Sequence, residues 1–424
     1  MPWKLLLLFS GKDFIFIASG KNPSYLSGYF INFLVLLDYF GKKMKQRIIG
    51  AIFLVAGTTI GAGMLAIPMT SAGLGFAKSS VLLTSLWLYM VLAAVLMVEI
   101  SKGKGQSIAA LADKHLGPVA KHIAGASLLV LFWSLLAAYI SGGSSILHQE
   151  FGGSQSIFSL IYTGILGFCV ISCTKVVDHT NRFLFIIKCI VFFVIIFTLL
   201  PFIQIDRLMM PVTYQPPVLL QAIPVFFTAF GFHGSLPSII NYLHGNKKGI
   251  YISIFAGSAI PLVVYILWQA ITLGVLGPNF ENTGNVGLFI SYLTAKTGSS
   301  YLTALVDLFA FLAIATSFLG VALGLFDYVS EWFPKKLEVR RKTVAAFCTF
   351  LLPLLFSLFY PSGFVFALGF ASIALSLLAV IFPSLIALFS KSKTSFFLSK
   401  SVSLFMLLGG VALIFIEIVA KLAL

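Results

Sequence analysis

Charged residues are scarce in this sequence. Asp, Glu, Lys and Arg make up only 10% of the 424 residues, whereas 59% are hydrophobic, and the mean hydropathy is +1.04. A water-soluble domain needs far more charge than this to cover its surface, so the composition excludes a soluble globular fold. No glycine-rich phosphate-binding loop is present either, which argues against nucleotide hydrolysis by this chain.

Acidic residues and cysteines are also few. The chain has 13 Asp and Glu and 4 Cys. All the cysteines fall within apolar segments, where packing explains them better than a metal site, because no further ligands stand at suitable spacing. The acids do not cluster, and no Ser/His/Asp set shares a common depth. We therefore expect no metal, no cofactor and no hydrolytic centre.

Long apolar runs dominate what the sequence does contain. Runs near or above about 18 residues recur along the chain, and each can cross a bilayer as a helix. The short alternating segments of an outer-membrane barrel are not seen. The pattern predicts an all-α integral membrane protein with eleven transmembrane helices, at about 48–70, 80–100, 122–147, 157–175, 182–201, 219–242, 250–275, 300–328, 343–360, 363–389 and 402–423.

The excess of basic residues follows the expected membrane topology. A formal net charge of +15 would suggest nucleic-acid binding in a soluble protein. If the amino end lies in the cytoplasm, however, nearly all Lys and Arg from Lys42 onward fall on the cytoplasmic side, as the positive-inside rule requires. Those on the other side are Lys78, Arg207, Lys296 and Lys421. We expect a cytoplasmic amino end, an external carboxyl end and no nucleic-acid partner.

The segment Gly57–Pro68 interrupts the first apolar run with three glycines, two threonines and a proline. In a helix interior each Gly costs about 1 kcal/mol and Pro about 3 kcal/mol relative to Ala. Unwound backbone at mid-depth persists only where it is buried in protein or lines a cavity. Its amides and carbonyls can then hold a zwitterionic substrate and a coupling ion. Close helix packing through small residues is the alternative interpretation.

A second broken segment, Thr228–Pro237, interrupts the sixth apolar run near its midpoint. The two breaks lie about 170 residues apart, and paired breaks in corresponding halves are the best sequence indication of a transporter site. The starts of the first five helices pair with those of the next five at similar spacing. Because five is odd, the second half enters the membrane from the opposite face. We predict a 5+5 inverted-repeat fold with broken helices 1 and 6, plus one peripheral helix.

Four segments resemble the bacterial hydroxy and aromatic amino acid permeases, a family of the amino acid–polyamine–organocation transporters. They are Gly57–Pro68, Ala138–Gly143, Phe230–Pro237 and Thr316–Tyr328. The resemblance covers roughly residues 45–424. It implies an importer of aromatic amino acids coupled to protons in the bacterial cytoplasmic (inner) membrane, with membrane lipids as its surroundings. Tyrosine is favoured over tryptophan, although these motifs do not separate the two.

Two alternatives remain open at this stage. One is a serine/threonine permease of the same family. The other, from a different class, is an integral-membrane enzyme acting on lipid-linked substrates, which would carry clustered charged residues at one interface rather than two mid-depth breaks.

The resemblance also implies a substrate site between helices 1, 3, 6 and 8. Amides of the first break would bind the substrate carboxylate, helped by the positive end of a half-helix. Carbonyls of Phe230 and Gly231 would bind the ammonium group, and aromatic side chains would contact the ring, although packing is an equally good explanation for any single Phe. The implied residues are Thr59, Gly61, Ala62, Gly63, Tyr139, Phe230, Gly231 and Phe232.

Two further residues are candidates for proton coupling. His233 is a polar imidazole at mid-membrane depth, where a functional role is the default expectation. It would bind substrate, latch helix 6 or carry a proton, or else serve structurally beside the break. Lys188 on helix 5 would, by resemblance to proton-coupled relatives, lie near Thr316 and Ser317 and release a proton when desolvated. Its alternative is an anchor that extends to the cytoplasmic interface.

Three regions are expected along the chain. Residues 1–43 form an amino-terminal extension without a signal-peptide pattern. We expect Met44 to be the true start, with an amphipathic or re-entrant element at Tyr25–Tyr39 as the rival interpretation. Residues 44–400 would form the transport core and 401–424 the peripheral helix.

Overall fold

The computed structural model describes residues 6–10, 13–17, 44–172, 174–212, 216–278, 280, 284–333, 338–390 and 395–422. Ten helices in these ranges are long and apolar enough to cross a membrane, and the bent pair Met44–Thr59 and α2 (Gly63–Ser71) makes eleven. The prediction of an eleven-helix membrane protein is confirmed. The other spans are α3 (Phe76–Ser101), α5 (Pro118–Phe151), α6 (Gln155–Ser172), α7 (Thr174–Leu199), α9 with α10 (Pro216–Ala229, Leu236–Tyr242), α11 (Lys247–Leu276), α13 (Ser300–Ser330), α14 (Glu338–Phe359), α15 with α16 (Phe364–Ser376, Phe382–Phe389) and α17 (Lys400–Leu422).

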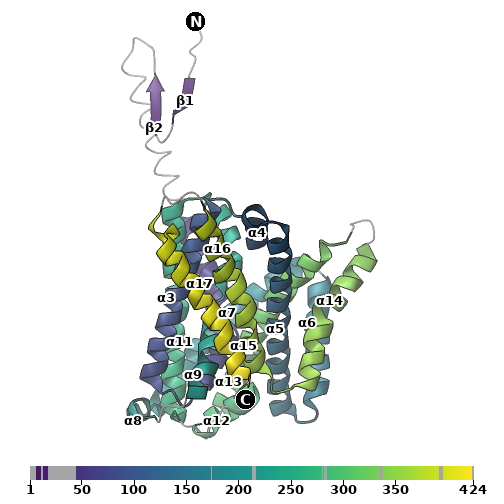
Figure 1. The fold of residues 1–424 in the computed structure, drawn as a ribbon. Helices are drawn as coiled ribbons and strands as arrows, with labels where there is room; N and C mark the ends of the chain where they lie inside the picture. Colours follow the sequence, from purple (N-terminus) through teal and green to yellow (C-terminus); the bar gives the residue numbers. More distant parts are fainter. Residues whose placement is uncertain are drawn as a thin grey trace, which may run out of the picture. The chain divides into compact units, whose positions relative to one another are not determined.

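Short helices lie at the two ends of the bundle. The helix α4 (Ile108–Leu116) lies at one end, and α8 (Ile205–Met209) and α12 (Val286–Ala295) lie at the other (Figure 1). With the predicted topology, α4 marks the cytoplasmic end. We refer below to the α4 end and the α12 end of the bundle.

Polar residues before the apolar runs set where several helices begin. The side chains of Ser107, Asn246, Asn285 and Ser299 each accept a hydrogen bond from the backbone amide three residues later, at 3.0 to 3.4 Å. Such N-caps satisfy amides that have no partner within the helix and contribute about 1 kcal/mol each. They begin α4, α11, α12 and α13.

The helix α5 is a central element of the bundle and packs against α6, α13, α14 and α15. The helix α2 packs against α9, and α7 packs against α13. The helix α11 contacts both α2 and α7, so the two pairs lie in the same part of the bundle. The last helix, α17, packs on α9, α15 and α16, where Lys421 pairs with the buried Glu417 at 3.3 Å.

The chain divides into two compact units, Met1–Ile49 and Gly50–Leu424. In the first unit, β1 (Leu6–Ser10) and β2 (Asp13–Ile17) form an antiparallel hairpin that the sequence analysis did not predict. The predicted element at Tyr25–Tyr39 lies outside the described residues. The predicted boundaries at residues 43/44 and 400/401 stay predictions.

Candidate substrate and coupling site

The first break separates Met44–Thr59 from α2, and the two helices meet at 54°. Residues 60–62 are not helical. A Cβ atom added at Gly61 would lie 2.5 Å from the Ser317 hydroxyl of α13. Because real Cβ atoms do not come this close to another atom, a larger residue here would displace the Ser317 hydroxyl from its bonds with the Ala62 amide and the Ala313 carbonyl.

The second break lies between α9, which ends at Ala229, and the 3₁₀ turn η2 (Phe232–Ser235) that precedes α10. Gly231, between them, has φ −76° and ψ 46°, which is not helical. The two breaks are in contact, because a Cβ atom at Gly63 would lie 3.2 Å from the Cα and Cβ atoms of Ala229. Backbone of both broken helices therefore meets at one place, as the inverted-repeat interpretation requires.

Four predicted residues donate or accept hydrogen bonds at the first break. The Lys188 ammonium donates to the Ile60 carbonyl at 3.0 Å and to the Thr316 hydroxyl at 3.3 Å. The Ala62 amide donates to the Ser317 hydroxyl at 3.1 Å. The structure thus brings together the break, the middle of α7 and the middle of α13.

The Lys188 side chain does not extend to a membrane interface. It is only 2% exposed, and its ammonium lies 4.8 Å from the centre of the Phe185 ring. It is held by a carbonyl and a hydroxyl, neither of which is charged. Because the Ile60 carbonyl belongs to the first break, any movement of the break changes the surroundings of this buried ammonium.

Tyr265 on α11 joins the two breaks and was missed by the sequence analysis. Its hydroxyl donates to the Thr59 carbonyl at 2.6 Å and lies 3.1 Å from the Ala229 carbonyl oxygen. The Thr59 hydroxyl donates within its own helix, to Val55 at 2.7 Å, so it is the carbonyl of Thr59 that takes part. One feature of the sequence could have pointed to Tyr265: its hydroxyl lies within an apolar run, and a polar group inside a membrane needs a hydrogen-bond partner.

The predicted aromatic residues divide into two groups. Tyr139 on α5 is 7% exposed, and its hydroxyl lies near the side chain of Ser317. Phe230 is fully buried, with its ring centre 5.5 Å from that of Tyr265. Phe232 instead stacks on His233 at 4.8 Å. Tyr139 and Phe230 therefore lie at the breaks, whereas the Phe232 ring packs against the imidazole of His233.

His233 is 3% exposed and bonds to α3 rather than to the residues at the first break. Its Nε2 atom lies 3.1 Å from the Met90 carbonyl oxygen, and among the described residues its Nδ1 atom has no partner. This contact joins the 3₁₀ turn η2 to α3, and the several roles expected of His233 stay predictions.

Glycine and polar residues are exposed on the segments that lead from the breaks toward the α4 end of the bundle. From the second break through α10, and along α13, such exposed or half-buried residues recur every three to four positions toward that end. These residues are Gly231, Gly234, Ser238 and Asn241, and Ser317, Gly320, Gly324 and Asp327. Polar faces at membrane depth line water rather than lipid. On the α12 side, by contrast, Met64–Ser71 and Pro224–Ala229 are buried.

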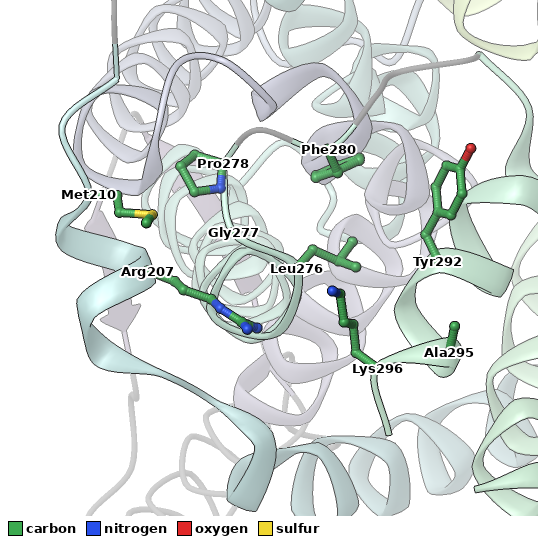
Figure 2. A pocket seen from close by; sticks show the side chains of 9 residues that line it. All are labelled: Arg207, Met210, Leu276, Gly277, Pro278, Phe280, Tyr292, Ala295 and Lys296. Atoms are coloured by element: carbon green, nitrogen blue, oxygen red, sulfur yellow. The ribbon is translucent and has the colours of Figure 1, made fainter. Parts of the chain in front are cut away.

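A separate cavity of about 560 Å³ lies at the α12 end, where none of the predicted site residues lines it. Figure 2 shows Arg207 of α8 and Lys296, just after α12, on either side of Leu276, with Tyr292 nearby. Arg207 donates to the Val275 carbonyl at the end of α11. This cavity is too far along the helices to belong to the breaks, and we assign it no part in the site.

Comparisons with known proteins agree with this arrangement. The model of the tryptophan/tyrosine permease family matches residues 44–423. Tyrosine-specific transport system 1 of Haemophilus influenzae is 41% identical over 350 residues, which cover 80% of this chain and 87% of that protein. The tryptophan-specific transport protein of the same organism is 35% identical over 375 residues, covering 83% and 90%.

A solved structure shares the fold. MhsT in complex with L-phenylalanine superposes with a TM-score of 0.60 over 88% of this chain and 98% of MhsT, at 12% sequence identity. At that identity the similarity concerns the fold alone.

Proposed function

The chain belongs to the tryptophan/tyrosine permease family, and we propose that it imports an aromatic amino acid, tyrosine in preference, together with protons. It is a multi-pass membrane protein and a permease rather than an enzyme. We place it in the bacterial inner membrane with its amino end in the cytoplasm. The observation that carries the proposal is the meeting of two broken helices beside a buried lysine.

The backbone at the breaks suits the two charged groups of an amino acid. The first amides of α2, around Gly61, Ala62 and Gly63, have no partners within the helix and carry its positive dipole end, so they would bind the carboxylate. The carbonyls of Phe230 and Gly231 would bind the ammonium group. Gly231 is exposed, whereas Phe230 is fully buried and its carbonyl already accepts a hydrogen bond from the Phe232 amide, so Gly231 offers the more open carbonyl.

Aromatic specificity would come from Tyr139 and Phe230, which flank the breaks from α5 and the sixth span. Ring contacts of this kind contribute about 0.5–1.5 kcal/mol each beyond burial. The preference for tyrosine is supported by the tyrosine-specific transport system at 41% identity, compared with 35% for the tryptophan-specific protein.

Lys188 would carry the coupling proton. Its charge-assisted bond to Ile60 is stronger than a bond between neutral groups, so loss of the proton weakens the connection between α7 and the first break. A proton and a substrate that both act on this break are then linked in free energy, which is the requirement for coupling. Thr316 and Ser317 hold the other side of the break from α13.

Uptake by purified protein in proteoliposomes tests the substrate. We expect labelled tyrosine to enter fastest, tryptophan and phenylalanine to compete, and serine to have little effect. Rapid serine uptake with no competition by aromatic amino acids would instead support a serine/threonine permease.

A further inference from the structure

The ends of two half-helices converge on the Tyr265 hydroxyl. The helix Met44–Thr59 ends at Thr59 and α9 ends at Ala229, and their last carbonyl oxygens lie 2.6 Å and 3.1 Å from this hydroxyl. Tyr265 is fully buried. A single O–H group therefore serves the carboxyl ends of both broken helices.

Two helix ends facing one point make a place that favours positive charge. The carboxyl end of a helix carries the equivalent of about half a negative charge. In transporters with discontinuous helices, such ends and the unwound carbonyls beside them are where a coupling cation binds. The phenol hydroxyl has one hydrogen, which it donates mainly to Thr59 and shares with the more distant Ala229 carbonyl; it carries no net charge, and its oxygen occupies the space between the two carbonyls.

We propose that Tyr265 occupies a latent site for a monovalent cation and thereby makes transport independent of sodium. This inference rests on the proposed function, because it concerns the same two breaks. The neighbouring Ile60 carbonyl likewise accepts a hydrogen bond from a side chain, the Lys188 ammonium. Side chains of this protein thus take up the carbonyls of Thr59, Ile60 and Ala229 that a cation would otherwise coordinate.

Tyr265→Phe tests the proposal because it removes only the hydroxyl oxygen. We would measure thermal unfolding of the purified protein in sodium chloride and in choline chloride at equal ionic strength. The wild type should unfold at the same temperature in both. The variant should unfold at a lower temperature in choline, and sodium should raise its Tm saturably, by about 2 °C or more.

Tyr162→Phe is the matched control. Tyr162 on α6 is 2% exposed, and its hydroxyl has no partner among the described residues. Loss of this hydroxyl leaves no carbonyl unpaired, so the control should show no response to sodium.

Transport gives a second measurement. Uptake by Tyr265→Phe in sodium-free medium should fall about tenfold, since two buried carbonyls lose their donor, and sodium should restore most of it. Tyr265→Ser, which keeps a hydroxyl but leaves room for an ion, should also respond to sodium.

The proposal is overturned if sodium changes neither the Tm nor the uptake of either variant, or if wild-type uptake itself requires sodium. Failure of both variants to fold even in sodium would also contradict it, because the ion should replace the missing donor. The thermal measurement needs no substrate, so it stands even if the chain proves to carry something other than aromatic amino acids.

Discussion

Replacing Lys188 with alanine should uncouple transport from the proton gradient. The substitution removes the ammonium that donates to the Ile60 carbonyl at 3.0 Å and to Thr316 at 3.3 Å. A buried hydrogen bond to a charged group contributes about 1.5–3 kcal/mol. At about 1.4 kcal/mol per tenfold change, gradient-driven accumulation should fall by about 10- to 150-fold.

The assay separates coupling from binding. Proteoliposomes with an imposed inward proton gradient report accumulation, and exchange of internal unlabelled for external labelled tyrosine reports transport without net coupling. We expect Lys188→Ala to lose accumulation and to retain exchange at a reduced rate. Lys104→Ala is the control, because Lys104 is exposed in the loop after α3 and should behave as wild type.

The coupling role of Lys188 would be refuted if Lys188→Ala accumulated tyrosine as the wild type does under the same gradient. Loss of both accumulation and exchange in a protein that is correctly inserted would instead make Lys188 a structural support of the first break.

Three further predictions follow from the contacts at the breaks. Gly61→Ala should reduce uptake at least about tenfold because its Cβ would meet the Ser317 hydroxyl. Gly320→Ala, on the same helix as Ser317, should be tolerated because nothing lies within 4 Å of its added Cβ. Equal uptake by the two variants would remove Gly61 from the site. His233→Gln should keep accumulation within about threefold of wild type, since the glutamine side-chain amide can still donate to the Met90 carbonyl. Loss of accumulation with exchange intact would instead make His233 the proton carrier. Deletion of residues 1–43 should leave expression and uptake unchanged, and reduced uptake at equal expression would show that the extension contributes to function.

The membrane fold could be predicted from the sequence because its signals are local. Each apolar run is set by its own residues, and the glycines and proline of Gly57–Pro68 weaken a helix wherever it packs. The eleven spans and both broken helices were predicted for this reason. The hairpin at Leu6–Ile17 was not, since β-pairing depends on partners elsewhere in the chain.

The position of Lys188 along its helix was harder to predict. The predicted membrane span 182–201 agrees with the apolar stretch Phe183–Phe202, but α7 itself begins at Thr174 and extends beyond that stretch. Lys188 therefore lies in the middle of the helix rather than near its start. Hydropathy marks the membrane-embedded part of a helix and not where the helix itself begins.

The distant contacts of Tyr265 and His233 could not be predicted. Tyr265 stands within an ordinary apolar run, and nothing local shows that its hydroxyl meets the carbonyls of Thr59 and Ala229. For the same reason the sequence left several roles open for His233, whose partner is a backbone carbonyl on α3.

Accumulation of labelled tyrosine by wild-type proteoliposomes in sodium-free medium tests the central claim most directly. With an inward proton gradient imposed, the account predicts accumulation above the external concentration and its collapse when a protonophore is added. Accumulation that requires sodium and is insensitive to the protonophore at fixed membrane potential would contradict it.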